Sequence, residues 1–194
     1  PPPYPTHNHD HKIIFNVTYT NLGANPFIFG GFALGGSASN NNVKYVKFTS
    51  TDAINNRVKK GALLVNYTGH GGPLGWTQER ILEIDQIQKW DNLNNLPLFM
   101  TATCKFSCFD DPAKVSAGEY LLLNDNGGAI ALLTTTRLVY AFPNYNLNTN
   151  FIDVLFEKYN GEFPKLGDLY KQTKVLSGSG SNTRNFIFSS NKYE

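Results

Sequence analysis

The chain has 194 residues, enough for one domain with a sizeable core. Its formal net charge is +2, and it has no dense run of lysines and arginines, so it lacks the electrostatic footprint of a nucleic-acid-binding protein. No apolar stretch approaches the roughly 20 residues that a membrane-spanning helix needs. The proline-rich start is not a signal peptide, so we expect either a cytosolic protein or a mature piece of a larger one.

The first 42 residues show no regular alternation of helix and strand. A strand is expected at 13–19, and glycine pairs and an asparagine run predict loops between 30 and 42. Three histidines alternate near the start of the chain: His7, His9 and His11. In a strand they would project to one face, as metal ligands do. A proline-rich terminus is more often a disordered tail, so no metal site is predicted and metal binding stays an alternative.

From residue 43 onward, short apolar runs alternate with amphipathic segments. Strands are predicted at 43–48, 62–67, 98–103 and 129–134. Helices are predicted at 51–61, 84–90, 116–124, 151–159 and 166–176. Apolar strands separated by helices indicate an α/β fold with a parallel sheet covered on both faces.

Two of the predicted strands end at reactive side chains. The strand at 62–67 leads into Thr68-Gly69-His70-Gly71-Gly72, and the strand at 98–103 leads into Cys104. Reactive groups collect beyond the carboxyl ends of parallel strands, so neighbouring strands would place the histidine and the cysteine at one cleft. A thiol attacks as a thiolate and needs a base, which His70 would supply. The backbone N–H groups of Gly71 and Cys104 are the predicted oxyanion donors.

Several of these residues also have a plainer interpretation. The glycine-rich turn around His70 can be an exposed turn, and a lone cysteine is usually a small buried hydrophobe. Cys108 is interpreted as a loop thiol without function. Trp76 and Tyr140 are candidates for lining a substrate pocket, although large aromatic residues are more often packing residues.

The motifs around the two strand ends resemble one peptidase family. They are Val65–Gly72, Gly75–Arg80 and Leu96–Cys104, and the likeness extends through Ser116–Tyr120, Gly127–Ala131, Thr134–Arg137 and Lys174–Gly180. Together they resemble the gingipain family of cysteine peptidases, over about residues 43–185. The closer likeness is to its sortase-like members in the type IX secretion system of Bacteroidetes.

The resemblance implies a fold and a set of site residues. The fold would be a three-layer, caspase-like α/β domain with a mostly parallel sheet flanked by helices, present here in incomplete form. His70 would be the catalytic base and Cys104 the nucleophile, forming a thioester acyl-enzyme without a cofactor. Substrate contacts are expected from Gly72, Trp76, Thr136 and Tyr140.

The sortase-like members also imply partners and a location. The substrates would be secreted proteins with C-terminal sorting domains, which are joined to anionic lipopolysaccharide at the bacterial cell surface with other type IX secretion components. Alternatives are a secreted gingipain-like peptidase, a metal-binding fragment or an inactive structural one.

The ends of the chain depart from the family pattern. We therefore divide the chain into an atypical segment at 1–42, a catalytic core at 43–185 and a divergent tail at 186–194. The acid that orients the histidine in the family cannot be assigned here. Asp10 and Asp52 are candidates by residue type only.

Overall fold

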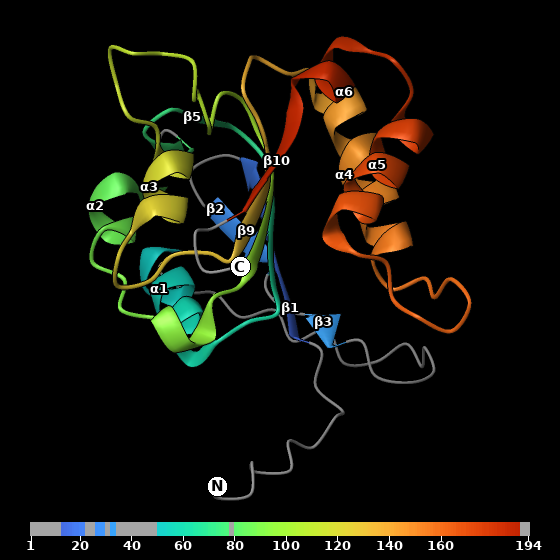
Figure 1. The fold of residues 1–194 in the computed structure, drawn as a ribbon. Helices are drawn as coiled ribbons and strands as arrows, with labels where there is room; N and C mark the ends of the chain where they lie inside the picture. Colours follow the sequence, from blue (N-terminus) through green and yellow to red (C-terminus); the bar gives the residue numbers. More distant parts are fainter. Residues whose placement is uncertain (1–12, 22–25, 30–31, 34–49, 78–79, 191–194) are drawn as a thin grey trace, which may run out of the picture.

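A mixed sheet forms the centre of the molecule, between two groups of helices (Figure 1). The computed structural model describes residues 13–21, 26–29, 32–33, 50–77 and 80–190, with side chains from residue 52 onward. The strands of the main sheet are β1 (Ile13–Asn21), β2 (Pro26–Phe29), β3 (Phe32–Ala33), β4 (Leu64–Thr68), β8 (Leu98–Ala102), β9 (Ala131–Thr135) and β10 (Phe186–Ser190).

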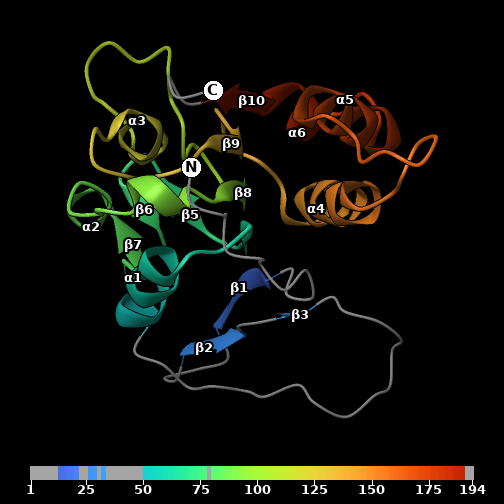
Figure 2. The ribbon, with the colours of Figure 1, turned by 60° about the horizontal axis from the view of Figure 1, so that its bottom comes forward.

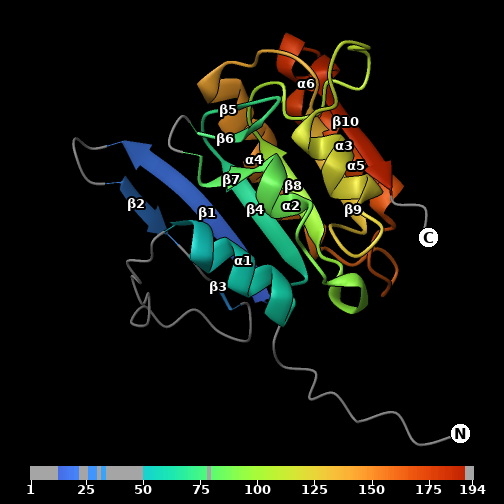
Figure 3. The same ribbon diagram turned by 90° about the vertical axis from the view of Figure 1, so that its left-hand side faces the viewer.

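The strand order is β10-β9-β8-β4-β1-β2, with β3 also paired to β1 (Figure 3). The four central strands β1, β4, β8 and β9 are parallel to one another. β2 and β3 pair antiparallel with β1, and β10 pairs antiparallel with β9. The mostly parallel α/β sheet flanked by helices was predicted from the sequence and is confirmed.

Helices cover both faces of the sheet (Figures 1 and 2). One face carries α1 (Ser50–Lys60), α2 (Ile84–Ile87) and α3 (Ala117–Leu123), and the other carries α4 (Ala141–Leu155), α5 (Leu166–Ser177) and α6 (Ser181–Asn185). A small antiparallel sheet of β5 (Gly71–Gly72), β6 (Gly75–Trp76) and β7 (Leu82–Glu83) follows β4. None of the helices in the described ranges is long and apolar enough to cross a membrane.

The alternating sides of the strands supply two separate cores. In β4, Val65 and Tyr67 pack in the cluster beneath α1–α3, whereas Leu64 packs beneath α4 and α5. Asn66 also faces α4, where its amide exchanges hydrogen bonds of 2.6 and 3.2 Å with the amide of Asn148. A strand buried on both faces has no solvent-facing side, which explains why most residues of 62–67 are apolar.

Most of the predicted elements are present with small shifts in their bounds. The strand predicted at 13–19 is β1, and the strands at 62–67, 98–103 and 129–134 are β4, β8 and β9. The helices predicted at 51–61, 116–124 and 166–176 are α1, α3 and α5. Ser116 caps α3 through a capping box with Glu119. The strand at 43–48 and the histidines of the first segment lie outside the described residues.

Two predictions of local structure were wrong. The helix at 84–90 ends at Ile87, after which the chain turns. The helix expected at 151–159 begins at Ala141, because its first half alternates asparagines with apolar residues and shows no clear apolar face in the sequence. The first residues of the segment 186–194, for which no secondary structure was predicted, form β10 of the main sheet.

Candidate active site

The turn after β4 carries His70 at the carboxyl edge of the sheet. The His70 carbonyl oxygen accepts hydrogen bonds from the Tyr67 hydroxyl at 2.5 Å and from Thr77 N–H at 2.9 Å. These bonds fix the backbone of the turn from β4 on one side and from the end of β6 on the other. The His70 side chain itself is exposed, so its ring is accessible to solvent and to a bound molecule.

Register brings His70 and Cys104 to the same level of the sheet. β4 and β8 are adjacent and parallel, and Thr68 pairs with Ala102. His70 and Cys104 each follow two residues beyond that pair. Gly69 N–H donates to Ala102 O at 3.4 Å, so the two chains stay together past the last paired residues. The prediction that both residues leave neighbouring parallel strands is therefore confirmed.

The loop after Cys104 is anchored in the core. Lys105 adopts φ = 52°, a left-handed conformation that is unusual for a lysine, and its N–H donates to Arg137 O at 3.1 Å. Phe106 is fully buried, with its ring centroid 5.9 Å from that of Trp76. Ser107 N–H donates to Thr135 O at 3.4 Å. The nucleophile candidate therefore begins a turn that is held by core packing and by the chain leaving β9.

The half-buried Cys104 thiol contacts the segment that follows β9. Val139 N–H points to the sulfur at 3.5 Å, and the sulfur lies 3.6 Å from Val139 O in a geometry suited to S–H donation. The segments that follow β8 and β9 thus meet at the Cys104 thiol. The sequence did not predict this contact with the segment after β9, because the contact uses backbone atoms, whose positions residue types do not reveal.

The backbone N–H groups predicted to bind an oxyanion are those of Gly71 and Cys104. Gly71 pairs with Trp76, and Thr77 N–H bonds to His70 O, so the alternating ladder turns Gly71 N–H away from β6. Cys104 N–H has no acceptor among the described residues.

The second cysteine, Cys108, is buried in the loop that follows Cys104. Burial raises the pKa of the Cys108 thiol, and the nearby Arg137, Lys105 and Lys114 only partly oppose this. The Cys108 sulfur bonds to the carbonyl oxygens of Lys105 at 3.4 Å and Thr136 at 3.6 Å. Cys108 is therefore a buried, protonated packing residue, in agreement with the interpretation that it has no catalytic function.

An exposed ion pair lies on the same loop. Arg137 donates to both carboxylate oxygens of Asp110, which lowers the pKa of Asp110 and raises that of Arg137. Asp111 also has a lowered pKa, through a hydrogen bond from Ala113 N–H and through Lys114. The Asp110 carboxylate is thus already paired with Arg137.

The predicted substrate contacts differ in accessibility. Tyr140 is 74% exposed, and a side chain added at Gly72 would meet nothing within 4 Å. The Thr136 hydroxyl is half-buried and donates to Asn185 O at 3.3 Å. Trp76 is fully buried and stacks on Tyr67 with ring centroids 4.2 Å apart, so packing replaces the substrate contact predicted for it.

The acid that would orient His70 is not found in the described part of the chain. No carboxylate there forms a hydrogen bond or ion pair with the His70 ring. Asp52 lies in the first turn of α1, and Asp10 lies outside the described residues. The described ranges likewise contain no cluster of three histidine, cysteine or acidic side chains that could hold a metal ion.

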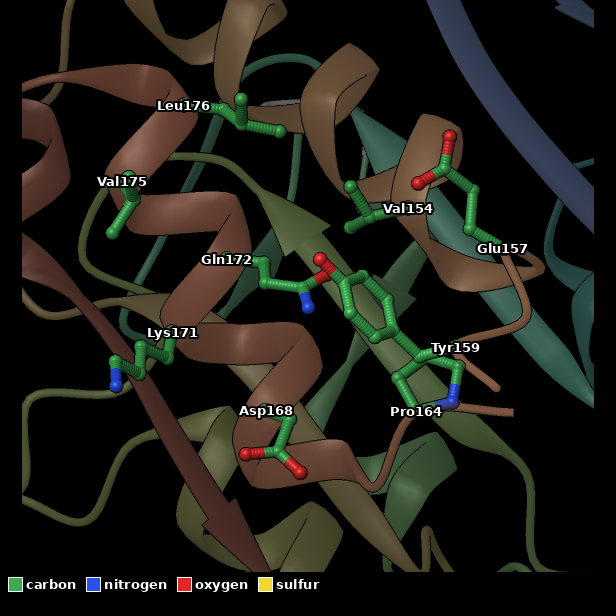
Figure 4. A pocket seen from close by; sticks show the side chains of 9 residues that line it. All are labelled: Val154, Glu157, Tyr159, Pro164, Asp168, Lys171, Gln172, Val175 and Leu176. Carbon is green, nitrogen blue, oxygen red and sulfur yellow. The ribbon is translucent and has the colours of Figure 1, made fainter. Parts of the chain in front are cut away.

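A cavity of about 520 Å³ lies apart from these strand exits. It is formed by the end of α4, the connection that follows and α5, and Tyr159 projects across it (Figure 4). Its lining side chains, which include Glu157, Asp168 and Lys171, all come from residues 154–176. None of the predicted site residues contributes to it.

The model of peptidase family C25 matches residues 18–191 of this sequence. The chain belongs to peptidase family C25. The match includes β10 and the second part of β1, from residue 18 onward, and so extends beyond the resemblance seen in the motifs at both ends. The family to which the chain belongs is one of gingipain-like cysteine peptidases. A search of the curated proteins found no match.

Solved structures of gingipains share the fold of this C25 chain. The Arg-specific cysteine proteinase gingipain R (RgpB) matches with 22% identity and a TM-score of 0.60, covering 70% of this chain and 32% of its own. A complex of the Porphyromonas gingivalis RgpB pro- and mature domains matches with 20% identity and a TM-score of 0.57, covering 66% and 31%. A structure described as a protease matches with 14% identity and a TM-score of 0.54, covering 69% and 35%. The chain thus spans about a third of each solved chain, and the expected caspase-like architecture is confirmed.

Proposed function

We propose that this chain cleaves a peptide bond with Cys104 as the nucleophile and His70 as the general base. The observation that carries the proposal is the register of β4 and β8, which places both residues at one level beyond adjacent parallel strands. A thiol and an imidazole at neighbouring strand exits are the parts that a cysteine peptidase needs. Membership in family C25 adds support from outside the geometry.

The reaction proceeds by acyl transfer through the sulfur. His70 takes the Cys104 proton, and the thiolate attacks the carbonyl carbon of the scissile bond. Gly71 N–H and Cys104 N–H bind the oxyanion of the tetrahedral intermediate. As the intermediate collapses, the C–N bond breaks, His70 returns the proton to the leaving amine, and a thioester remains on Cys104. Water or another amine then attacks the thioester and releases the thiol.

The acyl acceptor decides between a peptidase and a sortase. We propose the sortase reaction of PorU, in which a C-terminal sorting signal is removed and the new carboxyl end is joined to an amine of anionic lipopolysaccharide. The motifs Val65–Gly72 and Leu96–Cys104 support this choice, because they resemble the sortase-like members more closely. The proposal places the protein at the bacterial cell surface with other type IX secretion components. Hydrolysis by a secreted gingipain-like peptidase is the second candidate.

Trapping of the acyl-enzyme tests this proposal. The chain is mixed with a cargo protein that ends in a sorting domain, and the mass of the peptide that contains Cys104 is measured. We expect a thioester adduct that is absent from Cys104→Ala and slow to form in His70→Ala. An adduct on Cys108, or product formed equally by Cys104→Ala, would refute the dyad.

The fate of the trapped adduct separates the two candidate reactions. Conversion of the adduct to an amide when an amine acceptor is added supports the sortase, and release only to water supports the peptidase. A chelator should leave the reaction unchanged, whereas inhibition by it would favour the metal-binding alternative for the first residues.

A further inference from the structure

Helix α6 holds both ends of the segment that touches the Cys104 thiol. At one end, Thr136 N–H and the Thr136 hydroxyl donate to Asn185 O at 2.9 and 3.3 Å. At the other end, the Asn182 amide bonds to the backbone of Tyr140 in both directions, accepting from Tyr140 N–H at 3.2 Å and donating to Tyr140 O at 2.8 Å. Asn182 is 2% exposed, so water does not compete for these bonds.

Val139 lies between these two anchors and is the residue that meets the sulfur. Its N–H and its carbonyl oxygen are both at hydrogen-bond distance for sulfur, 3.5 and 3.6 Å from Sγ of Cys104. The carbonyl accepts the proton of a neutral thiol, and the N–H donates to a thiolate. One backbone residue thus offers a partner to each protonation state of the nucleophile.

We propose that Asn182 is a positioning residue of the active site, which acts through Val139 to hold the Cys104 sulfur in place before and after it loses its proton. The inference rests on the proposed function. In the resting chain, the S–H bond points to Val139 O. When His70 takes the proton, Val139 N–H remains beside the negative sulfur and keeps it at the same position for attack. The substrate carbonyl then meets a sulfur whose direction is already set.

Another buried asparagine, Asn92, makes the same pair of backbone hydrogen bonds at a place in the fold with no thiol nearby. Asn92 is 4% exposed and bonds to the backbone of Gly128 in both directions, at 2.9 and 3.0 Å. Gly128 precedes β9, and Tyr140 follows it, so the two asparagines fasten opposite ends of one strand. Asn92 is therefore a matched control for the folding cost of losing such a pair of bonds.

The test compares Asn182→Ala with Asn92→Ala in the full chain. A peptidyl chloromethyl ketone is the probe, and mass spectrometry of the Cys104 peptide gives kinact and KI at pH 7, beside the melting temperature. We expect both variants to melt at lower temperature. Only Asn182→Ala should lower kinact, by about ten-fold, because Val139 N–H is then no longer held beside the charged sulfur. KI should stay unchanged in both variants.

A second variant covers the case in which Asn182→Ala does not fold. Asn182→Ser keeps a hydroxyl that can make one of the two bonds, so its kinact should fall between those of the native chain and the alanine variant. Equal kinact in the native chain and in the Asn182 variants would overturn the inference while leaving the dyad intact. If the native chain shows no His70-dependent labelling of Cys104, the proposed function fails, and the inference fails with it.

Discussion

The two catalytic candidates lie on loops of opposite construction. The His70 turn is rich in glycine, carries an exposed ring and continues into a small sheet at the surface. The Cys104 loop turns back into the molecule, where Phe106 is fully buried and Cys108 is 7% exposed. The loop of the proposed nucleophile is thus fixed by the core, while the proposed base has a fixed backbone and an exposed side chain. Acyl transfer fits this division, because the base must follow a proton from the sulfur to the leaving amine.

Loss of the core anchor under the nucleophile should have the largest effect. Phe106→Ala removes a buried aromatic ring that packs against Trp76, and we expect it to lower the free energy of unfolding by about 3–5 kcal/mol. Leu74→Ala, in the turn between β5 and β6, is the control, because Leu74 is 61% exposed and its loss should change stability by about 0.5 kcal/mol at most. Urea unfolding measures both. Similar losses would show that the two loops do not differ in anchoring.

The two glycines after His70 should respond differently to the same substitution. A Cβ at Gly71 would lie 2.5 Å from the hydroxyl oxygen of Thr103, which is fully buried and cannot move aside cheaply. Gly71→Ala should therefore lower the free energy of unfolding by about 1–3 kcal/mol. Gly72→Ala meets open space and should be tolerated within about 0.5 kcal/mol. Thermal melting of the two variants tests whether the turn that carries His70 is tightly packed at Gly71 only.

The thiols should label at different rates. Cys104 is half-buried at the edge of the sheet, whereas burial raises the pKa of Cys108 and so lowers its thiolate fraction at neutral pH. With iodoacetamide at pH 7, we expect Cys104 to react at least about ten-fold faster than Cys108. The labelling of Cys108 should rise only at pH values above the ordinary range for a thiol. Peptide mass spectrometry over a pH series measures both rates, and equal rates at pH 7 would argue against activation of Cys104.

The smallest effect concerns the hydroxyl that fixes the base turn. Tyr67→Phe removes the bond from the Tyr67 hydroxyl to His70 O but keeps the ring stacked on Trp76. We expect a loss of about 1 kcal/mol in unfolding free energy and a several-fold slower labelling of Cys104 by a peptidyl probe. Unchanged labelling in a folded variant would show that Thr77 N–H alone holds the turn.

Much of this fold follows from patterns that the sequence displays directly. The parallel strands are buried on both faces, so Leu64–Thr68 and Leu98–Ala102 stand out as apolar runs, and the reactive residues follow at once. The motifs at those ends predicted that the two strands would be neighbours, and the observed pairing agrees.

The remaining features depend on contacts that residue types do not encode. Trp76 looks like a surface aromatic in a glycine-rich turn, yet the small sheet folds it over Tyr67. The first half of α4 is hidden by polar residues, because Asn144 is buried and Asn148 bonds to a strand. Asn182 gains its place from backbone groups of Tyr140, more than forty positions earlier in the chain. Such pairings appear only once the topology is known.

The position of α6 near the end of the sequence also determines when the segment after β9 gains its last hydrogen bonds during synthesis. Strands β4, β8 and β9 are made in order and pair with neighbours already present. The bonds that fix Thr136 and Tyr140 come from α6, so a ribosome must add about another forty to fifty residues after β9 before they form. At a synthesis rate of about 5–20 residues per second, several seconds pass between the addition of Cys104 and the formation of these hydrogen bonds. The segment that contacts the Cys104 thiol therefore gains its last hydrogen bonds only after α6 has been made.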